Sequence, residues 1–317
     1  MSGQRESEKK KEGIRTEGLS VVFHLPDGDV CAADDVSVCF EEGKITGLIG
    51  ESGCGKSVLG LAVLGLLPPY ASVEGKIYLD GELLKPETAR KYLGTEIGVI
   101  PQNPSESLNP ARTVGAHLME ALLPLKAGRR EKRERAEKLL RAFGFSETKR
   151  IWRAYPHELS GGMQQRVLCA IGAACSPRWI LADEPTKGLD SDLRWQVKET
   201  LLSLRSQGVR SMLVITHDLP FAREICDTMA VMYAGKIMES GSDVLKNPLH
   251  PYTKAFLAAL PEHGFQSMPG TALRAGEKTA GCPFAPRCMQ VEERCRKECP
   301  PAVSLEAGRS VRCFQYV

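Results

Sequence analysis

Apolar residues in this chain gather in short continuous runs instead of alternating with polar residues. Four of these runs are "ITGLIG" (45–50), "GVIPQ" (98–102), "WILADE" (179–184) and "SMLVITHD" (211–218), with helical patterns between them. A continuous apolar run is typical of a strand that is covered on both faces, as in a parallel sheet. The pattern therefore predicts an α/β fold around a mainly parallel sheet.

The stretch from about residue 103 to 177 has the periodicity of helices. Within it, "EKRERAEKLLRAFGF" (131–145) places four apolar residues on one helical face: Ala136, Leu139, Leu140 and Phe143. The charges of this segment alternate in sign, which indicates a solvated helix face and not a binding surface. We therefore expect a helical subdomain over about 103–177.

The two ends of the chain differ from this middle part. Residues 1–16 are polar and predict a disordered tail, whereas 19–40 hold short β-rich runs broken by the turn signal "LPDGD". After about residue 247 the periodicity weakens, and Pro, Gly and Cys become frequent. The predicted parts are a tail over 1–16, a main domain over 17–246 and a C-terminal extension over 247–317.

Length, composition and charge narrow the class of protein. The 317 residues exceed the usual size of one compact domain, and a formal net charge of +3 gives no reason to propose a nucleic-acid surface. The polar start lacks the apolar segment of a secretory signal, and the longest apolar run, from Val58, is too short to span a bilayer. We expect a soluble or peripheral protein in the cytosol, where structural disulfides are rare.

The segment "GESGCGKS" (50–57) fits the phosphate-loop pattern G-x-x-x-x-G-K-[ST]. It lies between an apolar strand and an apolar helix, which is the context that the mechanism requires. In such a loop successive N–H groups face the phosphates, Lys56 adds a positive charge and Ser57 offers a hydroxyl to Mg²⁺. The predicted nucleotide-binding residues are Gly50, Glu51, Ser52, Gly53, Cys54, Gly55, Lys56 and Ser57.

Two acidic residues end the apolar run "WILADE". Asp183, at the carboxyl end of the predicted strand, is expected to hold Mg²⁺ through water, and Glu184 is expected to polarise an attacking water. An Asp-Glu pair at the end of a strand is common on protein surfaces. The phosphate loop upstream favours the catalytic interpretation.

A second anion-binding helix start is predicted at "LSGGMQQR" (159–166), where Ser160, Gly161 and Gly162 precede a helical run. One nucleotide does not need two phosphate cradles far apart in the chain. A head-to-tail pair of such domains would use both, with each ATP held between the first cradle of one chain and the second cradle of its partner.

These motifs, in this order and spacing, resemble the ATP-binding subunit of an ABC transporter, a P-loop ATPase with a mixed or parallel sheet and a helical subdomain. In "IPQNPSESLNP", Gln102 resembles the family's Q-loop, which touches the metal site and the membrane partner. Residues 188–190, ending in Asp190, resemble the loop that reaches across the dimer. His217 resembles the histidine that contacts the γ-phosphate. The resemblance covers about residues 19–241.

Two positions of this sequence depart from the pattern of the family. The family places an adenine-stacking aromatic residue upstream of the phosphate loop, but "FHLPDGDV" is irregular there and offers only Phe23 or His24. In "TKGLD", Lys187 stands where many relatives carry a small or apolar residue, which bears on partner pairing.

The segment "NPLHPYTKAFLAALP" (247–261) resembles the part that follows the ATPase core in importers of oligopeptides, dipeptides and nickel. This resemblance implies a second ATPase chain, two transmembrane permease subunits and an extracytoplasmic substrate-binding protein as partners. It also implies a peripheral location on the cytoplasmic face of the membrane. The cargo itself does not follow from the sequence.

Five of the 11 cysteines lie in residues 282–313, with spacings C-x5-C-x6-C-x3-C-x13-C and no histidine among them. The peptide-importer branch carries a similar tail, and this resemblance implies a [4Fe-4S] cluster on Cys282, Cys288, Cys295 and Cys313, with Cys299 as an extra. A structural Zn²⁺ site and a set of reduced thiols are the alternatives. Four arginines near these cysteines are expected to offset a cluster's negative charge: Arg287, Arg294, Arg296 and Arg312.

The sequence therefore indicates an ATP hydrolase that drives import of peptides, nickel or related small solutes. The rival is a soluble ABC protein with an iron–sulfur cluster that acts in ribosome recycling or DNA repair. Such proteins usually carry two ATPase halves or a long coiled coil, whereas this chain has one set of motifs and no heptad run.

Overall fold

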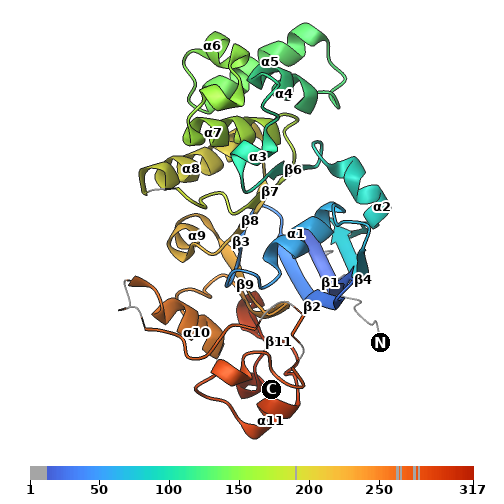
Figure 1. Cartoon of the computed structure of the whole chain (residues 1–317), viewed down its shortest axis with the longest axis vertical. Coiled ribbons are helices and arrows are strands. Elements are labelled where there is room, and N and C mark those ends of the chain that lie inside the picture. The colour runs from blue at the N-terminus through green and yellow to red at the C-terminus, as the bar shows by residue number, and fades with distance from the viewer. Residues whose placement is uncertain (1–12, 190, 262–263, 265, 274–275, 278) are drawn as a thin grey trace, which may run out of the picture.

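A computed structural model describes residues 13–317 apart from 190, 262–263, 265, 274–275 and 278 (Figure 1). The predicted site residue Asp190 and most of the predicted N-terminal tail therefore lie outside the described residues. Figure 1 shows an elongated molecule with a helical part at one end, two sheets in the middle and the C-terminal extension at the other end.

A mixed eight-stranded sheet runs through the middle of the molecule, as predicted, in the order β11-β12-β10-β9-β3-β8-β7-β6. Its parallel strands are β6 (Ile97–Ile100), β7 (Trp179–Asp183), β8 (Ser211–Thr216), β3 (Ile45–Ile49) and β9 (Thr228–Tyr233). The antiparallel strands are β10 (Lys236–Gly241), β12 (Ser310–Val311) and β11 (Val303–Ser304). Every residue of β3, β8 and β9 is buried, which explains why their sequences are continuously apolar.

A second, antiparallel sheet packs beside the first and holds the N-terminal part of the chain. Its order is β2-β1-β4-β5, with bounds β1 (Gly13–Leu25), β2 (Gly28–Glu41), β4 (Ala71–Leu79) and β5 (Glu82–Leu83). The predicted "LPDGD" turn joins β1 to β2. The predicted tail was too long, because residues 13–16 pair with β2 and residues 14–16 also pair with β4.

The described helices begin with α1 (Lys56–Leu64), which follows the phosphate-loop segment. The helices of the helical end and its surroundings are α2 (Pro86–Ala89), α3 (Pro104–Ser107), α4 (Val114–Ala121), α5 (Arg129–Ala142), α6 (Thr148–Arg153) and α7 (Gly161–Gly172). The remaining helices are α8 (Ser191–Ser203), α9 (Leu219–Ile225), α10 (Pro251–Ala258) and α11 (Glu293–Lys297). The predicted apolar face of α5 is confirmed, since Ala136, Leu139 and Leu140 are buried, and so is Phe143, which follows the last residue of the helix.

The C-terminal extension joins the rest of the chain through the sheet and through a shared core. Strand β12 pairs with β10, so the extension covers an edge strand of the large sheet. Tyr233 at the end of β9, Tyr252 in α10 and Phe284 form one aromatic cluster, with ring centroids 4.6, 5.5 and 5.3 Å apart. Ile49, the last residue of β3, belongs to the same buried core. The extension is therefore packed directly behind the phosphate-loop segment.

Among the residues that the structure describes, no helix is both long enough and apolar enough to cross a membrane.

We predict that Gly98→Ala destabilises the fold. A Cβ at Gly98 in β6 would lie 2.2 Å from the carbonyl oxygen of Gly172 in α7, and backbone cannot move aside as a side chain can. Overpacking of this kind costs about 1–3 kcal/mol, to be measured as a loss of unfolding free energy in urea. Gly128→Ala is the control: a Cβ there meets nothing within 4 Å, so we expect a loss below about 1 kcal/mol. Equal losses for both variants would contradict the steric argument.

Candidate functional site

The phosphate-loop segment leaves β3 and enters α1 through a tight backbone path. Gly50 has φ 155° and Gly55 has φ 105°, both in the region that favours glycine. A Cβ at Gly50 would lie 2.1 Å from the carbonyl oxygen of Met232, and one at Gly55 would lie 2.2 Å from that of Ala32. The neighbouring strands thus require glycine at these two positions of the loop.

Lys56 is held inside this loop. Its Nζ donates hydrogen bonds to the carbonyl oxygens of Gly50 and Glu51, each at 2.9 Å, and the residue is only 5% exposed. The ammonium group is therefore fixed at the point around which the loop turns. An anion bound in the loop would meet both this charge and the N-terminus of α1.

Ser57 and Asp183 come together across the site although they lie on different elements. The Ser57 hydroxyl donates to Oδ1 of Asp183 at 3.1 Å. Burial raises the pKa of Asp183, and the hydrogen bond from Ser57 opposes that shift. A serine hydroxyl beside a carboxylate is a set of hard oxygen donors that suits Mg²⁺. The two residues therefore fit the predicted magnesium site.

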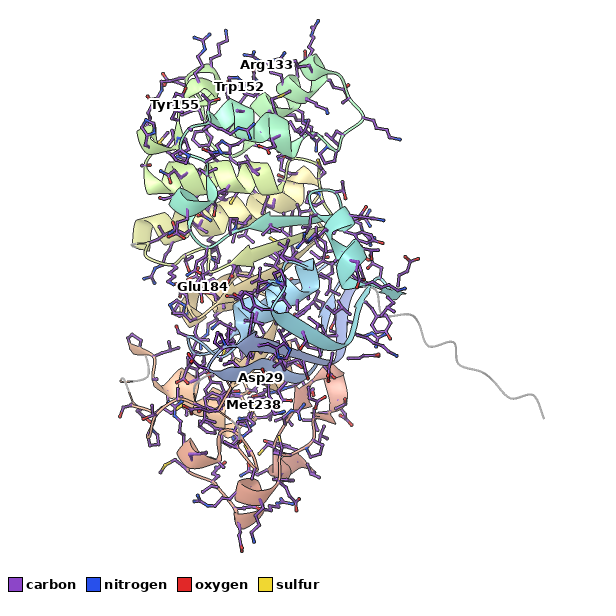
Figure 2. The ribbon with its side chains drawn as sticks, turned by 45° about the vertical axis from the view of Figure 1, so that its right-hand side comes forward. Asp29, Arg133, Trp152, Tyr155, Glu184 and Met238 are labelled. Atoms are coloured by element: carbon purple, nitrogen blue, oxygen red, sulfur yellow. The ribbon has the colours of Figure 1, made fainter. Side chains whose placement is uncertain are left out.

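Glu184 and His217 form a close pair at the ends of adjacent strands. Nδ1 of His217 lies 2.7 Å from Oε2 of Glu184, and Glu184 is 8% exposed. The backbone of Glu184 is in the left-handed region, with φ 47°, and its N–H donates to the carbonyl oxygen of Ile215 at 2.8 Å. A non-glycine residue in this region is strained, and such strain clusters at functional sites. Figure 2 shows Glu184 midway along the molecule, between the helical end and the extension.

A cavity of about 380 Å³ opens beside these groups. Its lining residues are Phe23, Val30, Ala32, Ser52, Gly53, Gly55, Lys56, Ser57, Val58, Gln102, Glu184 and Lys187. The structure thus brings the phosphate loop, Gln102 and Glu184 around one space of a size suited to a small ligand. Lys187, which the sequence linked only to partner pairing, also lines this space, and its charge acts on Asp183.

Phe23 and His24, the two possible adenine-stacking residues, are placed differently. Phe23 lines the cavity, and its ring centroid lies 6.1 Å from that of Tyr70. The ring nitrogens of His24 are taken by Asp29 at 2.8 Å and Ser72 at 2.9 Å. Phe23 is therefore the better placed of the two.

Ser160, Gly161 and Gly162 lie at the start of α7, outside this cavity. The Ser160 hydroxyl caps the helix by accepting from the N–H of Met163 at 3.3 Å. Helix α7 is linked to the Gln102 segment through the Ser105 hydroxyl, which donates to Gln164 at 3.1 Å. This second helix start is thus separate from the cavity that the phosphate loop lines.

The four predicted cluster cysteines converge in the extension. Cys282, Cys288, Cys295 and Cys313 line one cavity of about 20 Å³, which is room for about one water molecule. Burial raises the pKa of the Cys282 thiol to about 12, and the four cysteines that line the cavity form no disulfide. Four thiols are the donor set of an iron–sulfur cluster or Zn²⁺.

The convergence of these thiols does not amount to a metal site as it stands. Within the described residues, no group of three or more His, Cys, Asp or Glu side chains is placed so as to hold a metal ion. The cavity of about 20 Å³ would have to widen to take an iron–sulfur cluster.

Two of the four arginines that were predicted to offset a cluster's charge are paired with carboxylates. Arg287 pairs with Glu51 of the phosphate loop, at 2.8 and 3.1 Å, and Arg312 pairs with Asp35 at 3.2 Å. Sequence reasoning missed both contacts because it weighed only neighbours in the chain. Nothing in the sequences of the "GESG" and "CPFAPRC" segments predicts that the two segments contact each other.

Comparisons with known proteins give two matches to family profiles. The profile described as "ABC transporter" matches residues 33–187. The profile described as "Oligopeptide/dipeptide transporter, C-terminal region" matches residues 238–295, which include three of the four converging cysteines.

Curated relatives match over almost the full length. The chain is 36% identical to the oligopeptide transport ATP-binding protein AppD of Bacillus subtilis (strain 168), over 96% of each chain. It is 37% identical to the dipeptide transport ATP-binding protein DppD of Escherichia coli (strain K12), over 95% of each chain. It is 38% identical to the oligopeptide transport ATP-binding protein OppD of Salmonella typhimurium, over 96% of this chain and 94% of the other.

Solved structures match the larger part of the molecule. A dimeric bacterial ABC transporter cassette is 27% identical, with a TM-score of 0.63, over 72% of this chain and 98% of the other. The protein cbiO1 of Clostridium perfringens, part of the ABC transporter complex cbiONQ, is 25% identical with a TM-score of 0.61, over 74% and 90%.

We predict that Phe23→Ala weakens binding of a fluorescent ATP analogue by about tenfold, because stacking of a base on an aromatic ring contributes about 1–3 kcal/mol. The dissociation constant measured by fluorescence titration checks this. His24→Ala is the control, with an expected change below about twofold, because the His24 ring bonds to Asp29 and Ser72 outside the cavity lining. A larger effect at His24 than at Phe23 would reverse the assignment.

Proposed function

This chain belongs to the ATP-binding subunits of ABC transporters, in the oligopeptide and dipeptide branch, and from this premise we propose that it energises the import of peptides. It has the ABC ATPase fold, and it is an ATP hydrolase. The observation that carries the proposal is the cavity that joins the phosphate loop to Glu184, in a chain whose curated relatives match over almost their whole length. Nickel or a related small solute is the alternative cargo.

The site residues divide into two groups by their proposed roles. Lys56 and the loop amides hold the phosphates of ATP, while Ser57 and Asp183 hold Mg²⁺. Gln102 borders the same cavity and serves the metal site. Bound Mg²⁺ supplies charge that neutralises the phosphate oxygens. These groups bind and orient the substrate.

Glu184 and His217 act on the reaction itself. Glu184 orients and polarises the attacking water, and His217 contacts the γ-phosphate. Their 2.7 Å contact supports this division, because each side chain limits the movement of the other. The strained backbone of Glu184 supports a role at the reacting centre.

The second helix start completes the site of a partner ATPase. Ser160, Gly161 and Gly162 lie outside the chain's own cavity, which supports a head-to-tail dimer in which they contact the ATP held by the other chain. We place Asp190 at the same dimer contact from the family resemblance alone. Two transmembrane permease subunits and an extracytoplasmic binding protein complete the importer, with this chain on the cytoplasmic face of the membrane.

The rival function in ribosome recycling or DNA repair is not favoured. The C-terminal match to the oligopeptide/dipeptide transporter profile begins within β10 and runs into the extension. A transporter-type extension at this place supports a membrane partner.

For the extension we propose a [4Fe-4S] cluster held by Cys282, Cys288, Cys295 and Cys313, with a structural Zn²⁺ as the alternative. The shared cavity supports these ligands, and the backbone bond from Cys282 N–H to the Cys295 carbonyl oxygen, 2.8 Å, ties two of them together. A bound cluster would supply four iron–thiolate bonds that fix the loops of the extension.

We predict that Glu184→Gln leaves ATP binding intact and lowers turnover by at least about a hundredfold, because the amide cannot accept a proton from the attacking water. ATP hydrolysis is measured in the assembled transporter with a partner ATPase inactivated in the same way. Glu74→Gln, an exposed glutamate on β4, is the matched control and should keep full turnover. Normal hydrolysis by the Glu184 variant would remove Glu184 from the reaction.

We predict about four irons and four sulfides per chain in protein purified without oxygen, with a broad visible absorption band. Cys288→Ser should lose most of the iron, whereas Cys299→Ser should keep it, because Cys299 does not line the shared cavity. One zinc per chain without iron would establish the alternative metal. The absence of both metals would reject a metal site in the extension.

A further inference from the structure

Arg287 lies in the extension but directs its guanidinium group at the phosphate loop. It ends the short 3₁₀ helix Ala285–Arg287, between Cys282 and Cys288, and is only 6% exposed. Nη1 and Nη2 donate to the two carboxylate oxygens of Glu51 at 2.8 and 3.1 Å. This is a bidentate charge pair between positions 236 residues apart in the sequence.

The remaining contacts of Arg287 fix the orientation of its guanidinium group, whose Nη1 and Nη2 form the fork that binds Glu51. Its Nε donates to the carbonyl oxygen of Pro269 at 3.0 Å, and Nη1 also reaches the Tyr233 hydroxyl at 3.4 Å. The guanidinium carbon lies 5.7 Å from the centre of the Tyr233 ring. Arg287 is thus held from the extension and from strand β9 at once, so its charged end has little freedom.

Glu51 is the residue of the phosphate loop that connects Arg287 to the nucleotide site. Its carboxylate takes the Arg287 fork, its N–H donates to the Tyr252 hydroxyl at 3.1 Å, and its carbonyl oxygen accepts from Lys56 Nζ at 2.9 Å. Side chain and backbone of one loop residue therefore connect the extension to the lysine that meets the phosphates. The path contains two hydrogen-bonded steps, from Arg287 to Glu51 and from Glu51 to Lys56.

The burial of the two side chains explains why loss of the ion pair between Arg287 and Glu51 would disturb the phosphate loop. The Arg287 side chain is 6% exposed and that of Glu51 is 24% exposed. Removal of one partner leaves the other charge poorly solvated, which is far more costly than the loss of a surface ion pair. Glu51 would then turn toward water, and its backbone, which carries the bond to Lys56, would turn with it.

We propose that Arg287 is a positioning residue of the nucleotide site: it holds Glu51, and through Glu51 it holds the phosphate loop in the conformation that binds ATP. The proposal rests on the ATPase function given above. Because Arg287 lies between two cysteines of the shared cavity, the extension and the nucleotide are energetically linked. Any change at the cavity that shifts residues 282–288 alters ATP affinity, and ATP binding stabilises residues 282–288 in return.

The test compares variants of the full-length chain by titration with the fluorescent nucleotide mant-ATP. Arg287→Gln should weaken binding by about tenfold or more. This factor corresponds to the lower end of what one hydrogen bond to a charged group contributes. Arg287→Lys keeps the charge but not the fork, so its effect should be intermediate. Arg296→Gln, an exposed arginine of the same extension, is the matched control and should change binding by less than about twofold.

Two further readouts distinguish positioning from a general loss of stability. Glu51→Gln combined with Arg287→Gln should weaken binding no more than the stronger single variant, because both remove the same pair. Hydrogen exchange of the amides in residues 282–288 should slow when nucleotide is added to the wild-type chain, and should not slow in Arg287→Gln.

The outcomes separate this inference from the proposed function. A wild-type chain that binds no mant-ATP overturns both. A wild-type chain that binds, with Arg287→Gln within about twofold of it and additive double-variant effects, overturns only the positioning role. If Arg287→Gln does not fold, Tyr252→Phe tests the same path, since it removes the hydroxyl that accepts from Glu51 N–H. Unchanged binding and exchange in Tyr252→Phe and Arg287→Lys would then overturn the inference.

Discussion

Three parallel strands end at one edge of the large sheet, and the nucleotide site depends on their register. Ile49 of β3 pairs with Thr216 of β8, and Asp183 of β7 pairs with Ile215 of β8. The residues that follow these strand ends are therefore brought to one place: the phosphate loop, Glu184 and His217. A slip of one residue between any two strands would reverse the face of every side chain on one of them. The fully buried strands make such a slip costly, so the burial of the sheet protects the geometry of the site.

Several groups at these strand ends are held in an unfavourable electrostatic environment or backbone conformation. Asp183 is a carboxyl group with a pKa raised by burial, Lys56 is a buried ammonium and Glu184 has a left-handed backbone. Each would relax if its surroundings loosened. Hydrogen bonds between different elements oppose this, since Ser57 of the loop donates to Asp183 and the Glu184 N–H donates to the neighbouring strand. The stress therefore persists because the scaffold is rigid around it.

The sequence predicted those parts of the site that lie in local patterns. The strand, glycine loop and helix around Lys56 and the acidic strand end at Asp183 could be recognised because their spacing alone carries the chemistry. The second, antiparallel sheet was not predicted as a sheet. Strand β1 pairs with β4, and these two strands lie far apart in the sequence. The contact of Arg287 with Glu51 was missed for the same reason. A bidentate pair between distant segments leaves no periodic trace in either of them, so only the folded chain reveals it.

The distance along the chain between Glu51 and Arg287 also has a consequence for biosynthesis. Domains form from the N-terminus as the chain leaves the ribosome, at about 5–20 residues per second. Arg287 comes 236 positions after Glu51, so roughly 10 to 50 seconds pass between the synthesis of the two partners. During that time the phosphate loop has emerged without the arginine that binds its glutamate. The nascent chain therefore gains the ion pair between Arg287 and Glu51 only when translation is nearly finished.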